Sequence, residues 1–383
     1  MKKIPPTRLV ECLDTVRVFR AVLKSQPNVL AAIRPHYVIP TECDRDVIFP
    51  NLRVLELVIQ NPRGVTEHNV QNLIIPLLSP ELKRIQIKTG KGVLHMHDMY
   101  TCIAQRSKGL EELSLSSTSA GLAAAHFLTI HTISLQELHD ARDVVALGSI
   151  SGLKNLIITK QTISPLRRVT ATNEMTKDAF SDLVNLEITA NDINALTGLF
   201  MTLPFMTPST CSLLILRSDK DWAKIFELLE KRIAPTELNK LELWFRSETL
   251  RSPNDHDKWR DSGLTADHLR RLSPYRNLRQ FHFSASNIDR FQINAGDEDI
   301  KFLAMTCPRL VDLILEGSPA QTKSSITLMA LEYIRKSGSC QIAPKNNNKM
   351  VIDANKHDKR AKSTFASFDS ITTVPDSNRA ILR

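Results

Sequence analysis

A short stretch near residue 100 has side chains of the types that bind zinc. His95 and His97 flank Met96, and Cys102 follows four residues after Asp98. Imidazole and thiolate groups are the usual zinc ligands, and a structural zinc site takes four of them. The chain has no second ligand pair with matching spacing. We therefore interpret this stretch as the polar start of a helix, and we predict neither a metal nor another cofactor.

Two other stretches contain catalytic residue types without a catalytic pattern. Residues 89–92 read Thr-Gly-Lys-Gly, which lacks the G-x-x-x-x-G-K-S/T spacing of a phosphate-binding loop. Residues 255–257 read Asp-His-Asp, which could serve acid–base or metal chemistry, but the polar insert 246–262 around them favours an exposed loop. The G-x-S-x-G motif of serine hydrolases is also absent from the sequence. We predict that the chain is not an enzyme.

The most regular feature of the sequence is a repeated apolar pattern. Residues 308–317 read PRLVDLILEG, which has the pattern L-x-x-L-x-L. Most intervals between copies lie at or just above the roughly 20–29 residues of a leucine-rich repeat, where a strand is followed by a helical or irregular return segment. The fourth copy is the weakest, because Asp140 takes its third apolar position. The first positions of the copies are Leu52, Leu82, Leu110, Leu135, Leu153, Leu183, Cys211, Leu238, Leu278 and Leu310.

This pattern predicts an α/β leucine-rich repeat solenoid, a horseshoe with a curved parallel sheet and helical or irregular return segments. Strand side chains alternate between the two faces of a sheet, so the second and third apolar residues of each copy point into the core. One repeat cannot bury its apolar face alone, and neighbouring repeats must stack. Polar residues that follow the strands, such as Gln161 and Asn191, can hydrogen-bond the backbone of a turn.

The sequence divides into three parts. Residues 1–50 do not repeat, and we expect a cap segment with a helix within residues 15–30 and an extended link over 34–50. Residues 51–340 form the repeat domain. Residues 341–383 are polar and aperiodic, and we expect a disordered basic tail. Return helices are predicted at residues 99–107, 193–203, 221–233, 265–272, 299–305 and 328–335.

Charge and hydropathy narrow the class of partner. The net charge is +9, of which the tail contributes eight Lys or Arg against four Asp, so the repeat domain is only mildly basic and we predict no nucleic-acid partner. No apolar run reaches the roughly 18 residues of a membrane span, and the N-terminus lacks the apolar core of a signal peptide. The six cysteines are widely spaced, as expected for free thiols. We expect a cytoplasmic or nuclear protein, or one in both compartments.

The candidate binding site is the outward face of the sheet. Trp244 stands out there, because tryptophan is enriched among the residues that contribute most to protein interfaces. We predict that Arg217, Glu242, Trp244 and His282 lie on adjacent strands as part of a patch for a protein partner. The alternative is that the insert 246–262 folds over Trp244 and buries it. The predicted partner-binding residues are Arg217, Lys240, Glu242, Trp244, Gln280, His282, Asp312 and Glu316.

The repeats resemble those of fungal F-box proteins with degenerate leucine-rich repeats. The likeness is carried by IFPNLRVLEL at 48–57, by the unit at 262–283 that contains SGLTADHLRRL and NLRQFHF, and by GDEDIKFLAMTCPRLVDLILEG at 296–317. The resemblance implies the substrate receptor of an SCF-type ubiquitin ligase, with a substrate protein on the concave sheet. It implies a Skp1-type adaptor and a cullin as further partners if residues 1–50 contain a diverged F-box. The alternative is a stand-alone leucine-rich repeat scaffold without a ubiquitin role.

Overall fold

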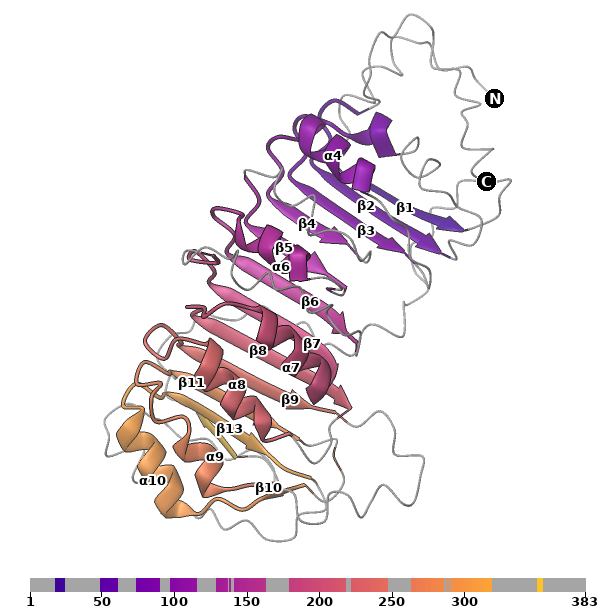
Figure 1. The fold of residues 1–383 in the computed structure, drawn as a ribbon. Coiled ribbons are helices and arrows are strands. Elements are labelled where there is room, and N and C mark those ends of the chain that lie inside the picture. Colours follow the sequence, from indigo (N-terminus) through magenta and orange to yellow (C-terminus); the bar gives the residue numbers. More distant parts are fainter. Residues whose placement is uncertain are drawn as a thin grey trace, which may run out of the picture.

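The computed structural model shows a long row of parallel strands (Figure 1). The main strands are β1 (Val18–Lys24), β2 (Val54–Gln60), β3 (Arg84–Thr89), β4 (Glu112–Leu115), β5 (Thr132–Leu135), β6 (Asn155–Gln161), β7 (Asn185–Asp192), β8 (Thr210–Arg217), β9 (Lys240–Phe245), β11 (Gln280–Ser284), β13 (Asp312–Glu316) and β14 (Met350–Asp353). The residues described are 18–24, 49–60, 74–89, 97–115, 129–136, 138, 141–162, 179–217, 222–246, 263–285, 288, 291–318 and 350–353.

The order of the strands in the sheet follows their order in the sequence. Within the described residues they form one 12-stranded sheet, β1-β2-β3-β4-β5-β6-β7-β8-β9-β11-β13-β14, in which β14 alone runs antiparallel to its neighbour. A second sheet pairs the short strands β10 (Gly263–Leu264) and β12 (Gln292–Ile293). Sequential parallel strands joined by return segments define a solenoid. The predicted leucine-rich repeat fold is therefore confirmed.

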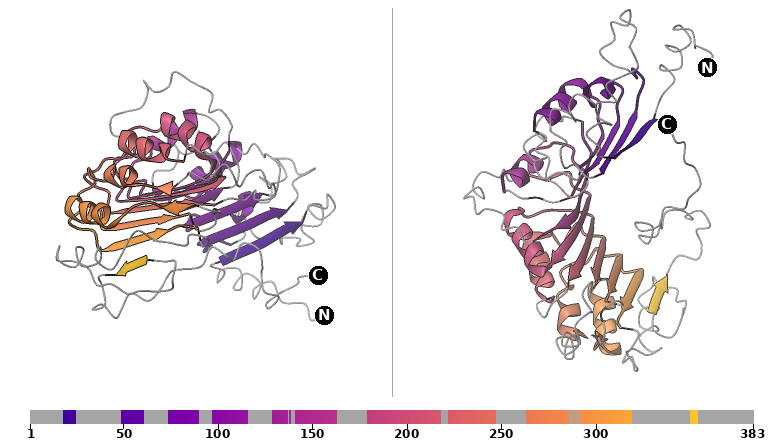
Figure 2. Two further views of the ribbon diagram at one scale, coloured as in Figure 1. Left: turned by 90° about the horizontal axis from the view of Figure 1, so that it is seen from below. Right: turned by 90° about the vertical axis from the view of Figure 1, so that its right-hand side faces the viewer.

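The helices lie on one face of the main sheet, and the opposite face is concave (Figure 2). The helices predicted from the sequence at 99–107, 193–203, 221–233, 265–272 and 299–305 are confirmed to within a few residues. None of the helices in the described ranges has the length and apolar content needed to cross a membrane. The helical segments are η1 (Ile75–Leu77), α4 (His97–Arg106), α6 (Ala141–Gly148), α7 (Ile193–Thr202), α8 (Lys224–Arg232), α9 (Ala266–Arg270) and α10 (Asp297–Thr306).

A ladder of shared backbone hydrogen bonds fixes the register of the repeats. The carbonyl of Arg53 accepts from the N–H groups of Lys83 (2.9 Å) and Arg84 (3.0 Å), which begin the next repeat. Because the backbone makes these bonds, they do not depend on the side chains of each copy, and degenerate repeats keep one register. The same two-donor arrangement recurs at the carbonyls of Lys83, Glu111, His131, Lys154, Val184, Ser209, Asn239 and Arg279.

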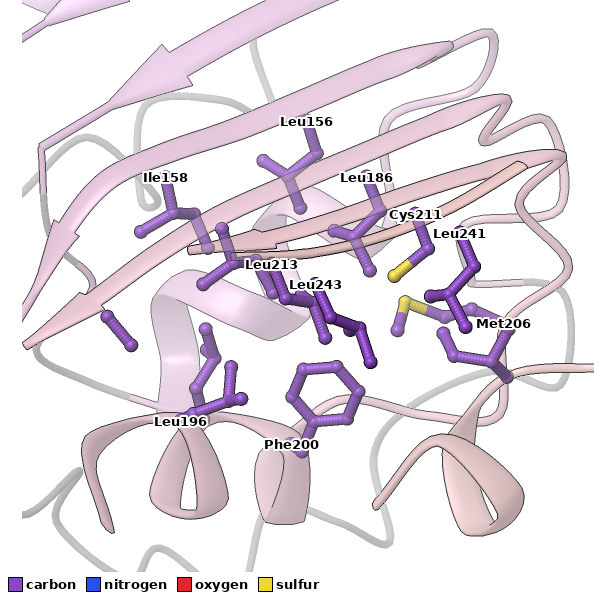
Figure 3. Close-up of a cluster of buried hydrophobic side chains, with 14 of the residues drawn as sticks. Leu156, Ile158, Leu186, Leu196, Phe200, Met206, Cys211, Leu213, Leu241 and Leu243 are labelled. Carbon is purple, nitrogen blue, oxygen red and sulfur yellow. The ribbon is translucent and has the colours of Figure 1, made fainter. Parts of the chain in front are cut away.

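The inward side chains of the strands form one continuous apolar core. In β7 and β8, Leu186 and Leu213 are at most 1% exposed, and they face Leu196 and Phe200 of α7 (Figure 3). Every second residue of these strands is buried in this way. Burial of this apolar surface against the return segments is the main stabilising contribution, at about 25 cal/mol per Å².

The N-terminal cap differs from its prediction. Residues 18–24 form β1 and not a helix, and Phe19 and Ala21 pair in parallel register with Leu55 and Leu57. The apolar residues of this segment fit the two-residue period of a strand as well as a helical period. An unpaired edge of β2 supplies backbone hydrogen bonds that an isolated helix would not gain. The predicted extended link at 34–50 falls almost wholly outside the described residues.

The weak fourth copy is real, but its position was predicted wrongly. Strand β5 places Ile133 and Leu135 in the core, beside Leu113 and Leu115. Its first apolar position is therefore Ile130, and Leu135 is the third position of the copy and not the first. With this shift, the intervals are 20 residues from Leu110 to Ile130 and 23 residues from Ile130 to Leu153. The second interval is long enough for β5 and the short helix α6.

The last residue of β6, Gln161, has a polar side chain that is buried in the core and hydrogen-bonds the backbone. The Gln161 side chain is 1% exposed, and its Oε1 accepts from the Leu138 N–H at 3.1 Å. Its Nε2 donates to the Leu138 carbonyl at 2.9 Å. The side-chain amide therefore hydrogen-bonds both the N–H and the carbonyl of Leu138, which lies between β5 and α6.

The C-terminal tail also contains a strand that the sequence did not predict. Residues 350–353 read MVID and pair antiparallel with β13, where Val351 is opposite Ile314. The open edge of β13 offers backbone donors and acceptors, and β-branched residues favour pairing there. Other residues of the predicted tail, the insert at 247–262 and the predicted helix at 328–335 lie outside the described residues.

Candidate functional site

The outward side chains of β7 to β13 form three rows across the concave face. Each row contains residues that are paired in the strand register, so its neighbours lie about 4.8 Å apart. The first row is Asn185, Thr210, Lys240, Gln280 and Asp312. The second is Glu187, Ser212, Glu242, His282 and Ile314, and the third is Thr189, Leu214, Trp244, Ser284 and Glu316.

Trp244 and His282 form the centre of the candidate site. Their ring centroids lie 4.1 Å apart, and the rings are inclined at 61°. Both side chains come from outward positions of neighbouring strands, β9 and β11, and both are partly buried. An edge-to-face arrangement of this kind is favourable for aromatic rings. The pair therefore offers a fixed aromatic surface on a sheet that is otherwise lined by smaller or charged residues.

Glu316 connects the aromatic pair to β13. His282 Nε2 lies 4.0 Å from Glu316 Oε2, and both side chains are less than 15% exposed. The Ser284 hydroxyl donates to the same carboxylate oxygen at 2.8 Å. Within the described residues, His282 Nε2 is buried and has no hydrogen-bond partner.

The face beside the aromatic pair has more acidic than basic groups. Lys240 Nζ lies 2.9 Å from Glu242 Oε1, so these two residues form an ion pair. Burial raises the pKa of the Glu187 carboxyl, the negative charge of Glu242 raises it further, and Lys240 acts in the opposite direction. One lysine thus balances only part of the negative charge of the second row.

Apolar side chains complete the surface on both sides of the pair. Leu214 is the register partner of Trp244, and Ile314 is the register partner of His282. Both lie at outward positions and are partly buried. The sequence analysis did not identify them, although Ile314 could have been found from the two-residue period of β13.

Arg217 does not belong to the patch. The register pairs Cys211 with Leu186 and Leu241, so Cys211 is the second apolar residue of its copy and not the first. The copy begins at Pro208, and this odd shift exchanges the two faces of the strand. Leu214 is therefore outward. Arg217 is the last residue of β8, and its register partner is Asp192.

The other predicted site residues lie where the register placed them. Glu242, Trp244, His282 and Glu316 are brought together, whereas Lys240, Gln280 and Asp312 form the adjacent first row. Residues 247–262 lie outside the described ranges, and the alternative that they cover Trp244 is not tested. Of the residues with zinc-ligand side chains near residue 100, His97 and Cys102 lie on α4, and the described ranges contain no group of three metal-binding side chains.

Comparisons with known proteins give matches among solved structures. No protein-family model and no curated protein sequence matches it. An internalin from Listeria monocytogenes is 17% identical over 88% of this chain and 89% of its own, with a TM-score of 0.32. A leucine-rich repeat protein from Leptospira interrogans is 14% identical over 87% of this chain and 96% of its own, with a TM-score of 0.24.

Proposed function

We propose that this chain is a non-catalytic protein-recognition module that binds a protein partner on its concave sheet. The observation that supports it most directly is the Trp244–His282 pair at 4.1 Å, flanked by Leu214 and Ile314. Aromatic side chains surrounded by weaker contacts that exclude water are typical of the residues that dominate binding. We call these four residues together with Glu242 and Glu316 the aromatic patch.

The charges favour a partner that places a cationic side chain on the aromatic patch. A lysine or arginine head group over Trp244 would gain a cation–π contact. The carboxylates of Glu242 and Glu316 would add charge-assisted hydrogen bonds, which are stronger than neutral ones. The sheet backbone holds these groups in place before binding, so little conformational entropy is lost on complex formation.

The finer form of the proposal is that the module is the substrate receptor of an F-box-type ubiquitin ligase. It is supported by the resemblance of residues 48–57, 262–283 and 296–317 to the repeats of fungal F-box proteins. In this form, the substrate binds the concave sheet, and a Skp1-type adaptor and a cullin bind the N-terminal segment. The stand-alone scaffold is the alternative, and both place the partner on the same face.

The test is affinity purification of the tagged full chain from its own cells, followed by quantitative mass spectrometry. In the double variant Trp244→Ala with His282→Ala, we expect the recovery of a set of proteins to fall about tenfold or more. A tenfold fall corresponds to a loss of about 1.4 kcal/mol of binding free energy. Gln86→Ala with Lys88→Ala is the matched control, because these residues have the equivalent outward positions on β3. Equal recovery with both double variants would exclude the aromatic patch. Co-purification of the adaptor and the cullin decides between the ligase and the scaffold.

A further inference from the structure

A second surface, distant from the concave face, has exposed apolar side chains. It is a groove of about 680 Å³ at the edge of the solenoid where α9 and α10 end. Its apolar lining includes Pro274, Phe302, Met305 and Pro308. Phe302 is 37% exposed and Met305 is 73% exposed. Apolar side chains of this size normally lie in the core, so their grouping around one hollow indicates a binding surface.

Three arginines belong to the two turns that form this groove. Arg276 lines it, Arg309 follows the lining residue Pro308, and Arg279 immediately precedes β11. All three are exposed, and none forms an ion pair with another residue of the described ranges. The acidic residue Glu237 lies in the turn before β9. The groove therefore combines an apolar floor with a net positive rim.

One basic residue elsewhere along the same edge has its charge compensated. Lys83, at the position equivalent to Arg279, lies 2.8 Å from Glu111 of the next repeat. The pKa of the Glu111 carboxyl is lowered, mainly by its hydrogen bond with Lys83. Arg53 and Lys154 take the same position in their repeats and, among the described residues, form no ion pair either. What distinguishes the last two repeats is the combination of such arginines with an apolar hollow.

A comparison of α10 with α7 indicates that the groove also depends on the side chain of Phe302. α7 and α10 end alike, because Met201 and Met305 are each the residue before a final threonine. Thr202 and Thr306 both donate to the carbonyl three residues earlier. Three residues before each methionine, α7 has Gly198, whereas α10 has Phe302. Met201 is 57% exposed and provides a control of the same type.

We propose that this groove binds an acidic segment of a partner protein through a bulky apolar side chain of that segment. The apolar side chain fills the hollow over Phe302 and Met305, and neighbouring carboxylates pair with Arg276, Arg279 and Arg309. Bidentate arginine–carboxylate pairs supply direction, and the buried apolar side chain supplies most of the affinity. The site goes beyond the aromatic patch, because it lies at another edge and selects the opposite charge.

The test uses the full chain and a synthetic 12-residue peptide that contains glutamate, two phenylalanines and a neutral dye. Fluorescence anisotropy should show saturable binding at low salt that weakens at high salt, because exposed charges are screened there. A peptide with glutamine for glutamate, and a peptide with serine for phenylalanine, should each bind about tenfold more weakly, the effect of about 1.4 kcal/mol. Equal binding of the glutamine peptide, or no binding of the acidic peptide, would overturn the proposal.

Variants of the chain locate the site. Phe302→Ser and Arg276→Glu should each weaken binding about fivefold or more, and Arg276→Glu should reduce its salt dependence. Met201→Ser and Arg53→Glu are the matched controls and should leave it within about twofold, with unchanged melting curves for all four. Equal loss in the controls would exclude the groove. Binding that appears only after deletion of residues 354–383 would identify the chain's own tail as the occupant, which also overturns the proposal.

Discussion

The repeats near the two ends of the solenoid have the same backbone ladder and different interiors. From β2 to β6, the inward residues are leucine and isoleucine, as in Leu55 and Ile87. From β9 to β13, the interior contains Phe245, Phe281 and Phe283, and Trp222 packs against Phe245 and Phe283 from the return side. Because the ladder keeps the strands in one register, the larger rings must be accommodated behind the sheet.

The concave faces differ in the same way. In the second row, β3, β4 and β5 present Gln86, Ser114 and Ser134, whereas β9 and β11 present Glu242 and His282. The outward rings of Trp244 and His282 therefore lie over the aromatic interior. A rigid interior holds the outward side chains in fixed positions, which lowers the entropy lost on binding. Under the proposed function, the aromatic repeats bind the partner and the aliphatic repeats mainly extend the solenoid.

The substitution Trp222→Ala should have the largest effect on this comparison. Trp222 is 3% exposed, and its ring lies 4.7–6.1 Å from five other rings, including those of His268 and Phe291. Its removal should lower the free energy of unfolding by about 3–5 kcal/mol. Since repeats interact mainly with their neighbours, the aromatic repeats should then unfold before the aliphatic ones.

Two spectroscopic signals distinguish these outcomes. All three tryptophans lie at or after residue 222, so tryptophan fluorescence reports on the later repeats, whereas circular dichroism reports on the whole solenoid. In the Trp222→Ala variant, the fluorescence transition should precede the dichroism transition in denaturant. Ile87→Val is the control in the aliphatic half and should cost only about 0.5–1.5 kcal/mol. Coincident transitions in Trp222→Ala would show that the two halves are one cooperative unit.

The next effect in size comes from the aliphatic half. Gln161→Leu removes the amide that bonds both backbone groups of Leu138, which leaves a buried N–H and a buried carbonyl without these partners. An unsatisfied buried polar group costs about 1–3 kcal/mol. Denaturant unfolding followed by circular dichroism measures the loss. Gln86→Leu on the open face is the control, and a similar loss there would mean that the Gln161 bonds contribute little.

The repeats themselves could be predicted because their period is strong. The sequence identified the sheet, five of the return helices and most of the outward residues of the aromatic patch. The errors came from copies with a replaced leucine. At residues 211–216, the run CSLLIL allowed two registers three residues apart, and only the neighbouring strands decide between them. This is why Leu214 was missed and Arg217 was included.

The two strands at the ends of the sheet were harder to predict for a different reason. β1 and β14 have no L-x-x-L-x-L pattern, and their positions depend on the open edges of β2 and β13. Edge pairing is a tertiary effect, since the same short sequence gains its hydrogen bonds only when a neighbouring strand is present. The groove beside α10 was missed because it requires two turns that are over 30 residues apart in the sequence.

A smaller effect should make the aromatic half sensitive to acid. His268 contacts Trp222 and Phe226, and its Nδ1 accepts from the Thr265 N–H at 3.1 Å. Burial lowers the pKa of this imidazole below its ordinary value of 6.5, and the nearby Arg271 lowers it further. The unfolded chain therefore binds a proton more readily. This contribution to stability is present above pH 6.5 and is lost as the pH falls through the lowered folded-state pKa.

The variant His268→Gln isolates this contribution, because glutamine can also accept from the Thr265 N–H in a capping box. Wild type should lose more stability than the variant between pH 7.5 and pH 5.5, as measured by tryptophan fluorescence in denaturant. The exposed His131 provides the control, His131→Gln, which should follow wild type. An unchanged pH dependence in His268→Gln would place the acid sensitivity outside the aromatic interior.

The smallest effect concerns the face above the aromatic half. Burial and Glu242 raise the pKa of the Glu187 carboxyl above its ordinary value of 4.5, so the folded protein holds this proton more tightly than the unfolded chain does. Stability from this group is present below pH 4.5 and is lost as the pH rises through the raised folded-state pKa. Glu187→Gln should therefore be more stable than wild type at pH 7, within the roughly 0.5 kcal/mol of most surface changes, and no more stable at pH 4.

The same variant should bind a cationic partner more weakly, because it lacks the negative charge of Glu187 that the partner would offset. A variant that is less stable at pH 7 would show that Glu187 is already neutralised in the free protein, and the second row would then offer less attraction to a cation than we propose.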